Sequence, residues 1–229
     1  MNNKNNLSSI SSKKFEENKY TEVIIPVGSF EQHGPHGALG TDFLIAQRIA
    51  ELISKKTNIP CLPPIAYGCS KIHMSKAGTI SIEKDIFYGY LKNIIESLYK
   101  SKVKKIYIIN GHGGNITTIR KIKETFENLV DVVHISWWIE GKELDIFSAE
   151  EGHHAGSEEM SVLMTISESL VDKKEFIDTE IKEYDPYLVN DINELTETGS
   201  IGVVSTASKD RGEKYLNILI DKIIEKYDL

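Results

Sequence analysis

Three short runs of apolar and largely β-branched residues predict buried strands. They lie at 21–28 (TEVIIPVG), 103–110 (VKKIYIIN) and 130–138 (VDVVHISWW). Runs of this length and composition are typical of strands that are covered on both faces. Two further extended pieces are expected at 60–68, where prolines interrupt the run, and at 78–82.

Apolar residues at helical spacing predict helices between these strands. From Asp42 onward they recur every three or four residues, and in 83–101 they line one face of a helix. On that face we expect the inward side chains to be Phe87, Tyr90, Leu91, Ile94, Ile95 and Leu98. The other helices are expected over 115–128, 157–169 and 213–227, and the stretch 170–200 is acidic and irregular. Strands that alternate with helices predict a layered α/β domain with a mostly parallel sheet.

Length, composition and charge narrow the class of protein. The 229 residues fit one domain, which we place at 21–229, and 1–20 is expected to be a mobile tail or, alternatively, a short surface helix. The net charge of -7 argues against binding to nucleic acid through its phosphates. No apolar run approaches the ~20 residues of a membrane span. Only two cysteines are present, as suits a reducing cytosol, so a cytoplasmic location is expected.

Polar clusters follow the predicted strands. GSFEQHGPHG comes after the first strand, GHGGN after the second, and EEGHHAG several residues after the third. In open parallel sheets, ligands bind beyond the carboxyl ends of the strands. Three loops that reach one edge of the sheet can therefore build a single site from residues distant in sequence.

The residue types in these loops point to a metal site. Glu31 and His33 are two positions apart, so they face the same way in an extended segment. Asp42 follows a glycine-rich loop that lets the chain fold back, and His112 lies in NGHGGN. Acidic and imidazole groups together suit zinc, manganese or iron. If Asp42 bridges two ions, the site is a binuclear hydrolase centre.

Each of these residues also has an ordinary structural explanation. Asp42, with Thr41, could cap the helix that follows it. Glu31 could be a solvated loop residue, His33 and His36 surface histidines, and His112 a residue that stabilises its own loop. GHGGN could instead bind a phosphate at the start of a helix. The metal hypothesis is favoured because three such clusters occur at strand ends together.

A fourth cluster lies in EEGHHAGSEEMS. His153 and His154 are adjacent, so both cannot face the site if the segment is extended, and periodicity does not say which one does. Glu158 and Glu159 begin the next helix, where geometry directs only one of them inward. We expect the other to be a solvated surface charge.

Taken together, the residues resemble the creatininase family of metal-dependent amidohydrolases. The resemblance runs from Pro26 to Gly212 and rests on PVGSFEQHGPHGALGTDFLIA, GTISI, NGHGGN, HAGSEEMS and GSIGVVSTASKDRG. It implies a three-layer α/β/α fold, two divalent metal ions and hydrolysis of C–N bonds in amides or cyclic amides.

The resemblance also implies roles for single residues. Glu31, Asp42 and His112 would bind one ion, and His33 would bind the other together with a bridging Asp42. His154 would polarise the substrate carbonyl or transfer a proton. Glu159 matches the glutamate that relatives carry five positions after that histidine.

The sequence departs from the creatinine-cleaving members of the family. Those carry a ligand glutamate two residues after the Asn-Gly-His histidine, where this chain has Gly114. Glu159 is the expected substitute. Met160 stands where many relatives have threonine, and 36–39 reads HGAL in place of His-Leu-Pro-Leu. These differences argue against creatinine as the substrate.

Length and composition are most similar to the archaeal formamide hydrolases of this family. Those release formate from a formylamino-pyrimidine ribonucleotide monophosphate in riboflavin and coenzyme F420 biosynthesis. They use ferrous iron, or iron with zinc, and manganese also suits the ligands. The alternatives are a creatinine amidohydrolase, a mycofactocin-type peptidase, or a metal or nucleotide sensor without turnover. The resemblance further implies a homo-oligomer, a dimer or a hexamer.

Candidate contacts to the substrate are spread over the chain. A phosphate could bind Lys209 and Arg211, or free N–H groups at the helix after GHGGN, although the two cations could equally lie in a solvated loop. Trp138, or Trp137, could stack on a pyrimidine ring or be buried against the sheet. His36 and His73 are further candidates, with a loop histidine of no special role as the alternative for His73. His134 is expected to be a satisfied core residue.

Overall fold

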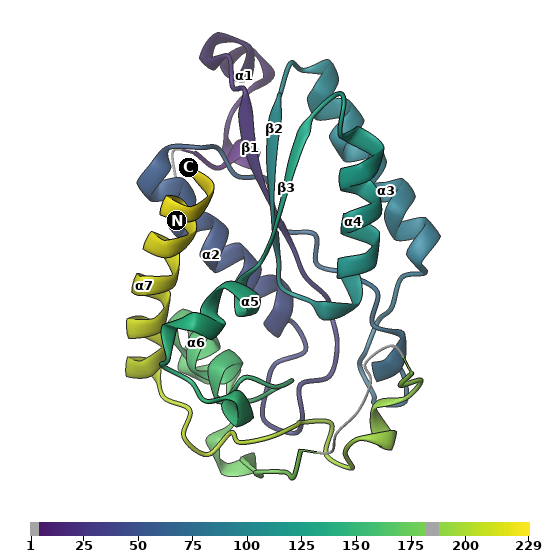
Figure 1. Cartoon of the computed structure of the whole chain (residues 1–229), viewed down its shortest axis with the longest axis vertical. Coiled ribbons are helices and arrows are strands. Elements are labelled where there is room, and N and C mark those ends of the chain that lie inside the picture. The colour runs from purple at the N-terminus through teal and green to yellow at the C-terminus, as the bar shows by residue number, and fades with distance from the viewer. Residues whose placement is uncertain (1–4, 182–187) are drawn as a thin grey trace.

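The computed structural model of the chain describes residues 5–181 and 188–229. Its sheet contains β1 (Glu22–Val27), β2 (Lys105–Asn110) and β3 (Asp131–Ser136), all parallel and in the order β1-β2-β3. The register aligns Val27 of β1 with Asn110 of β2, and Asn110 with Ser136 of β3. The carboxyl ends of the three strands therefore lie at one edge of the sheet, at the bottom of Figure 1.

The expected strand at 60–68 is not a regular strand. Cys61 and Ile65 form isolated parallel bridges with Ile24 and Val27 at the free edge of β1. Pro60, Pro63 and Pro64 have no N–H to donate, so a continuous ladder cannot form there. The expected extended piece at 78–82 is likewise reduced to one bridge, between Ile80 and Phe30.

Helices cover both faces of the sheet, so the fold is the predicted three-layer α/β/α arrangement (Figure 1). On one face lie α2 (Thr41–Thr57), α5 (Trp137–Gly141), α6 (Ser157–Ile166) and α7 (Lys209–Tyr227). On the other lie α3 (Lys84–Lys100) and α4 (Ile116–Phe126). Short 3-10 helices occur at Leu7–Ser9, Lys71–His73, Gly113–Asn115, Lys142–Leu144, Ala149–Glu151, Glu168–Leu170, Lys173–Glu175 and Ile192–Glu194.

The strands divide the apolar core into two parts. Along β2, Tyr107 and Ile109 pack toward α2 and α7, whereas Ile106 and Ile108 pack toward α3 and α4. This alternation follows from the two-residue period of a strand. It explains why the predicted strands read as continuous apolar runs.

Several predicted details are wrong. Tyr90 is 53% exposed on α3 rather than inward. Trp137 and Trp138 do not end the third strand but start α5, and Trp137 is fully buried against Tyr215. The last helix begins at Lys209 rather than near 213 because the side chain of Ser208 caps it by accepting from the Arg211 N–H.

The N-terminal segment contains the short surface helix that was the alternative to a mobile tail. This helix, α1 (Ser12–Asn18), begins at a Ser11 cap and buries no residue. Before it, the Leu7 N–H donates to the Cys61 carbonyl and the Cys61 N–H to the Asn5 carbonyl. These bonds attach the segment beside β1.

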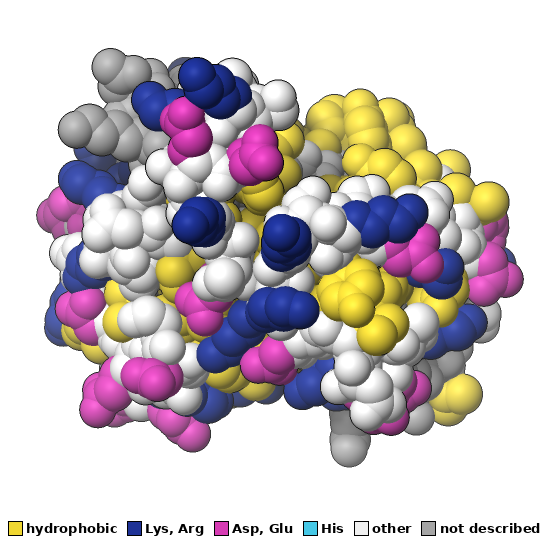
Figure 2. Space-filling view, turned by 90° about the horizontal axis from the view of Figure 1, so that it is seen from above, with side chains coloured by type: hydrophobic (Ala, Val, Ile, Leu, Met, Phe, Trp, Pro, Cys, Tyr) yellow, Lys and Arg dark blue, Asp and Glu magenta, His cyan; other side chains and the backbone are white. Residues whose placement is uncertain are grey.

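The two ends of the molecule differ in chemistry. Viewed from above, at the amino ends of the strands, the surface mixes lysine, arginine and acidic side chains with apolar patches, and no histidine of the described residues is visible (Figure 2). Within the described chain, no helix is long and apolar enough to cross a membrane. Except for His134, which lies in β3, the histidines lie in the segments that follow the strands, at the opposite end.

Candidate metal centre

Glycines let the start of α2 approach the carboxyl ends of β1 and β2 closely. A Cβ atom on Gly28 would lie 2.3 Å from the Phe43 nitrogen, and one on Gly111 would lie 2.2 Å from the Asp42 carbonyl oxygen. Only residues without a side chain fit at these two positions. The first turn of α2 is thereby held against the strand ends, which brings Asp42 beside the loops that follow them.

The Asp42 side chain does not cap its helix. The cap position is Gly40, which makes no side-chain bond, and the Asp42 carboxylate instead turns into the site. Its Oδ2 accepts a hydrogen bond from Ser29 Oγ at 2.6 Å. Its two oxygens also lie 2.9 Å from His33 Nε2 and 3.0 Å from His112 Nδ1. The carboxylate therefore stands between the two histidines.

Glu31, Asp42 and His112 form a buried group at this position. His112 Nδ1 lies 3.2 Å from Glu31 Oε2 and 3.0 Å from Asp42 Oδ2. The other ring nitrogen, Nε2, lies 3.1 Å from the Cys69 carbonyl oxygen, to which it donates its proton. In the neutral ring, the lone pair of Nδ1 thus points at two carboxylates. A cation between these three side chains would make such an arrangement favourable.

His33 repeats this arrangement on the other side of Asp42. Its Nδ1 donates to the main-chain oxygen of Glu31 at 3.1 Å. Its Nε2 faces Asp42 Oδ1 at 2.9 Å and Glu159 Oε2 at 3.8 Å. A ring nitrogen held by a backbone carbonyl, with the second nitrogen turned to carboxylates, is typical of histidines that bind metals.

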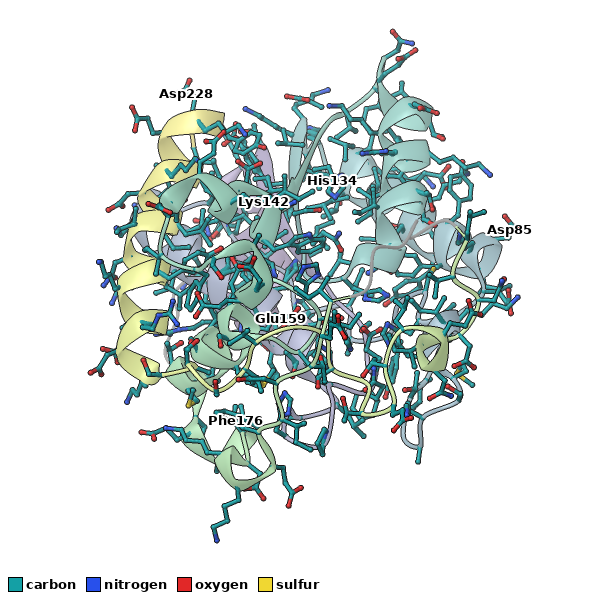
Figure 3. The ribbon with its side chains drawn as sticks, turned by 60° about the horizontal axis from the view of Figure 1, so that its bottom comes forward. Asp85, His134, Lys142, Glu159, Phe176 and Asp228 are labelled. Carbon is teal, nitrogen blue, oxygen red and sulfur yellow. The ribbon has the colours of Figure 1, made fainter. Side chains whose placement is uncertain are left out.

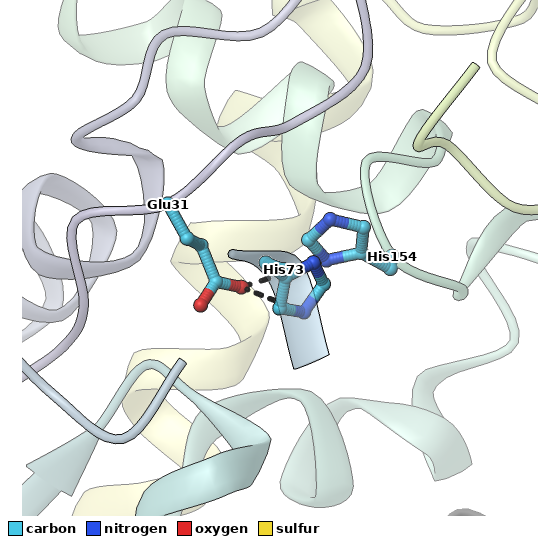
Figure 4. A group of neighbouring side chains, drawn as sticks. All are labelled: Glu31, His73 and His154. Atoms are coloured by element: carbon cyan, nitrogen blue, oxygen red, sulfur yellow. Dashed lines mark ion pairs between the residues drawn. The ribbon is translucent and has the colours of Figure 1, made fainter. Parts of the chain in front are cut away.

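Two more histidines complete the cluster. Of the adjacent pair, His154 faces the site, with Nδ1 3.8 Å from Glu31 Oε1, whereas the described contacts of His153 do not reach it. His73, which the sequence indicated only as a possible substrate contact, is buried with Nε2 3.4 Å from the same oxygen (Figure 4). Beyond its being a histidine near GTISI, the sequence carried no signal for this position.

Three overlapping groups of side chains have ligand atoms within 4.8 Å of one another. They are Glu31–Asp42–His112, His33–His154–Glu159 and Glu31–His73–His154. Glu31 is 1% exposed, yet neither of its carboxylate oxygens accepts a hydrogen bond of good geometry from a described residue. A buried carboxylate without such partners is costly, and a divalent cation would compensate its charge. The residues present therefore fit a metal ion.

The pKa shifts show how the charges depend on one another. Burial alone would lower the pKa of His33, but the carboxylates of Asp42, Glu159 and Glu31 raise it to about 10. The pKa of His112 is raised as well, because Glu31 and Asp42 outweigh its burial. For Asp42, burial and Glu31 raise the pKa, yet His33 and His112 bring it down to about 2. Protons on these two rings thus balance the acidic groups, and metal ions would displace them.

Of the two adjacent glutamates, Glu159 faces the site. Its Oε2 accepts the Ala155 N–H at 2.7 Å, and burial together with Asp42 raises its pKa to about 8, although His33 opposes the shift. It lies near the centre of Figure 3, at the end that carries the loops, while His134 lies farther up beside the sheet.

The prediction for the other glutamate is wrong. Glu158 is 6% exposed rather than a solvated surface charge, and it accepts a hydrogen bond from Tyr215. Burial raises its pKa to about 7, although the bond from Tyr215 opposes the shift. The two neighbours on α6 both lie in the interior because α6 is covered by α7 on one side and by the site loops on the other.

Gly114 lies where no side chain fits. A Cβ atom there would be 2.1 Å from the Cys69 carbonyl oxygen and 2.5 Å from His112 Nε2. The space that a glutamate would need is thus filled by the carbonyl that orients His112. Glu159 reaches the His33 side from α6 instead.

Other residues proposed from the sequence lie away from this cluster. Arg211 is engaged by both carboxylate oxygens of Glu151, and Lys209 is paired at the surface with Glu213 at 3.9 Å. His36 is buried, with Nε2 2.9 Å from the Ala155 carbonyl oxygen, so it supports the loop below His154.

Trp138 packs edge-on against Trp137 and the core. His134 is bonded to Ser136 Oγ at 3.0 Å, as expected of a satisfied residue.

Comparison with known proteins identifies relatives of the whole chain. The sequence profile of the creatininase family, described as creatinine amidohydrolase, matches residues 8–227. The 3-dehydro-scyllo-inosose hydrolase of Thermotoga maritima is 29% identical over 177 residues, which are 72% of this chain and 56% of that protein. The mycofactocin precursor peptide peptidase of Mycolicibacterium smegmatis is 31% identical over 205 residues, 84% and 78% of the two chains.

A shorter match is of interest for the substrate. The 2-amino-5-formylamino-6-ribosylaminopyrimidin-4(3H)-one 5'-monophosphate deformylase of Methanocaldococcus infernus is 31% identical over 110 residues, 48% of each chain. The aligned region thus spans about half of that protein, and little more than half of the Thermotoga maritima hydrolase.

Solved structures share the fold. One described as "Creatininase Mn" superposes with a TM-score of 0.83 at 21% identity, over 97% of this chain and 96% of the other. A variant described as a Zn-Zn type of creatininase gives 0.82 at 21% identity, over 96% of each chain. At this identity, the superpositions establish the three-layer fold.

Proposed function

The chain belongs to the creatininase family, and we propose that it is a metal-dependent amidohydrolase whose centre is built on Glu31, Asp42 and His112. One observation carries this proposal. In both His33 and His112, one ring nitrogen donates to a main-chain carbonyl and the other faces buried carboxylates. One of these carboxylates, Glu31, has no hydrogen-bond donor of its own among the described residues. Such an arrangement is suited to binding cations and serves no evident structural purpose.

The arrangement is suited to two ions. Asp42 presents Oδ1 to His33 and Oδ2 to His112, so one carboxylate can serve both. Oxygen and nitrogen donors without sulfur suit Fe²⁺, Zn²⁺ or Mn²⁺. When bound, two such ions act as a Lewis acid and lower the pKa of a water molecule at the site.

The side chains of the cluster also differ in their access to solvent. This difference distinguishes residues that would hold the ions from residues that would contact the substrate. The side chains of His33 and Asp42 are 0% and 3% exposed, whereas those of His154 and Glu159 are 17% and 16% exposed. We infer that substrate enters past His154 and Glu159. Burial raises the pKa of Glu159, and its carboxyl group is placed to deliver a proton to the departing amine. His154, with a lone pair on Nδ1, is placed to accept a proton.

For the substrate, we propose the formamide group of the formylamino-pyrimidine ribonucleotide monophosphate, with release of formate. The match to the Methanocaldococcus infernus deformylase supports this branch. Position 114 is a glycine, where the creatinine-cleaving relatives carry a glutamate, and this argues against creatinine as the substrate. With Arg211 bound to Glu151, the remaining place for the phosphate is the start of α4, where no side chain caps the helix. A homo-oligomer, a dimer or a hexamer, stays a prediction.

A peptidase is the second candidate. The Mycolicibacterium smegmatis peptidase matches 84% of this chain, against 48% for the deformylase. A peptide bond is also an amide, so the same centre could cleave it. The two candidates differ in what must fit beside Glu159, a formyl group with a nucleotide or an extended chain.

One experiment tests the proposal and separates the candidates. The protein is purified without oxygen, loaded in turn with Fe²⁺, Zn²⁺ and Mn²⁺, and assayed with the formylamino-pyrimidine nucleotide, a set of peptides and creatinine. Formate release that Asp42→Asn abolishes is the expected result. Peptide cleavage alone would favour the second candidate. Tight binding of metal without hydrolysis of any of the three would contradict the enzyme and favour a sensor.

A further inference from the structure

Gln32 lies between Glu31 and His33 and is buried at 5% exposure, but its side chain belongs to none of the three groups of ligand atoms. Its amide contacts three separate segments of the chain. The Nε2 atom lies 2.9 Å from His73 Nδ1 and 3.0 Å from both the Gly199 carbonyl oxygen and His154 Nε2. The Oε1 atom accepts the Gly34 N–H at 2.9 Å. The main-chain oxygen of Gln32 lies 3.0 Å from His154 Nε2.

These contacts determine which way the amide points. The Gly34 N–H can only donate, so the group that faces it must be the amide oxygen. The NH₂ group then faces Gly199 and His73, and it supplies one proton to each. Position 199 requires glycine for two reasons. Its φ of +91° is rarely adopted by other residues, and a Cβ atom there would lie 2.0 Å from Gln32 Oε1.

The orientation of the amide dictates the protonation of His73. A proton on His73 Nδ1 would face the protons of the amide, so Nδ1 must be the acceptor. The neutral ring therefore carries its proton on Nε2, which faces Glu31 Oε1 at 3.4 Å. A ring nitrogen that holds a proton cannot bind a metal ion. His73 thus directs a proton, and not a lone pair, toward Glu31, at a distance too long and poorly aligned for a good hydrogen bond, and it is not a ligand.

His154 is held the opposite way round. His154 Nε2 lies 3.0 Å from both the amide nitrogen and the main-chain oxygen of Gln32. The main-chain oxygen can only accept, so His154 Nε2 donates to it, and the two amide protons are left for Gly199 and His73. The lone pair of His154 is then on Nδ1, on the side of Glu31 (Figure 4). His73 and His154 therefore differ in what they direct toward Glu31 Oε1. His73 directs a ring proton toward it, and His154 directs a lone pair.

We propose that Gln32 is a positioning residue, which fixes the proton of His73 toward Glu31 and the lone pair of His154 toward the centre. The proton positions assigned to His73 and His154 follow from the contacts of Gln32. Only the statement that they serve amide hydrolysis rests on the proposed function. The assignment of the His73 proton removes Glu31–His73–His154 from the three candidate groups, because that group then offers only one nitrogen ligand. Partners of this kind change metal affinity or activity by about 10- to 100-fold when they are removed.

The test is the protonation of the ring nitrogens, measured by long-range proton–nitrogen NMR correlation on histidine-labelled protein, with and without Zn²⁺. In the metal-free wild type we expect His73 and His154 to carry their protons on Nε2. Gln32→Glu keeps the shape and the bond from Gly34 but replaces the donor by an acceptor, so the proton of His73 should move to Nδ1. Gln32→Met removes the amide and leaves only the Glu31 carboxylate to favour a proton on Nε2, so the preference of His73 for that nitrogen should weaken.

Controls separate this inference from folding and from the proposed function. Gln47→Met makes the same change on the outer surface of α2, where the amide bonds only Glu51, and should change neither the spectrum nor the metal affinity. Gly199→Ala should displace the Gln32 amide and shift the His73 signals without altering Gln32 itself. An Nδ1 proton on His73 in the folded wild type would overturn the inference. If the wild type instead shows the expected protons but hydrolyses no amide, only the proposed function fails.

Discussion

His33 Nε2 lies 2.9 Å from Asp42 Oδ1, and both side chains are buried. The contact joins the loop after β1 to the first turn of α2, and it exists because Gly28 and Gly111 let that turn approach the strands. It also places His33 Nε2 at Asp42 Oδ1, whereas His112 Nδ1 lies at Oδ2. The approach of α2 to the strand ends therefore determines that the Asp42 carboxylate lies between two histidines.

Replacement of Asp42 should remove metal binding on both sides of the cluster. Asp42→Asn keeps the size of the side chain but replaces one carboxylate oxygen by an NH₂ group. That NH₂ group cannot bind a metal ion, and it would take the place of the oxygen that faces either His33 or His112. We expect metal affinity to fall at least about 100-fold and activity to be lost. Calorimetry with Zn²⁺ checks this result. Lys209→Ala, at an exposed pair far from the site, is the control and should bind as the wild type does.

Metal should stabilise the folded chain. Ions that bind only the folded state raise its stability by mass action, by about 2.7 kcal/mol at a hundredfold excess over Kd. We expect a chelator to lower Tm and added Zn²⁺ or Mn²⁺ to restore it. In Asp42→Asn, Tm should not respond to either treatment. An equal response of both proteins would place the bound ion elsewhere.

Adjacent glycines after β2 should differ in their tolerance of a side chain. Gly114→Ala forces a Cβ to within 2.1 Å of the Cys69 carbonyl, which orients His112, whereas Gly113 has no neighbour within 4 Å of a built Cβ. We expect Gly114→Ala to cost about 1–3 kcal/mol in the free energy of unfolding and to weaken metal binding. Gly113→Ala is the matched control, with a change below about 1 kcal/mol. Similar losses in both variants, measured by urea unfolding, would contradict this account.

The Glu151–Arg211 pair should contribute stability that depends on pH. The bonds from Arg211 and Thr206 lower the pKa of Glu151 to about 2, although partial burial opposes the shift. Because the folded state holds the carboxylate ionised, the contribution is complete above the unfolded pKa of ~4.3 and is lost as pH falls toward the folded pKa.

The corresponding variant is Glu151→Gln. It should lower the free energy of unfolding by about 1–2 kcal/mol at pH 7, after allowance for the partly exposed Arg211, and the difference from wild type should shrink as pH falls below ~4.3. Unfolding series at pH 7, 5 and 3.5 measure it. Glu213→Gln, in the exposed pair with Lys209, should change stability by less than about 0.5 kcal/mol at every pH. A difference for Glu151→Gln that grew toward low pH would contradict the assigned sign.

Much of the fold follows from local patterns. Apolar runs at 21–28 and 103–110, and the helical spacing after Asp42, predict β1, β2 and α2 because buried strands and one-sided helices impose different periods on the sequence. The pattern fails at Trp137 and Trp138, where an apolar run continues past the end of β3 into α5. Apolar content alone does not distinguish a buried strand from a buried helical turn.

The sequence by itself determined the residue types of the centre and their positions after strands, because parallel strands deliver their following loops to one edge. Its periodicity could not choose between His153 and His154, although the family resemblance implied His154. Nor could it show that Glu158 is buried, that Arg211 is engaged by Glu151, or that His73 and Gln32 join the cluster. Those outcomes depend on contacts between segments separated by up to 167 residues, such as Gln32 with Gly199. Only the packed tertiary structure decides them, since a side chain's direction in a loop is set by the neighbours that fill the space around it.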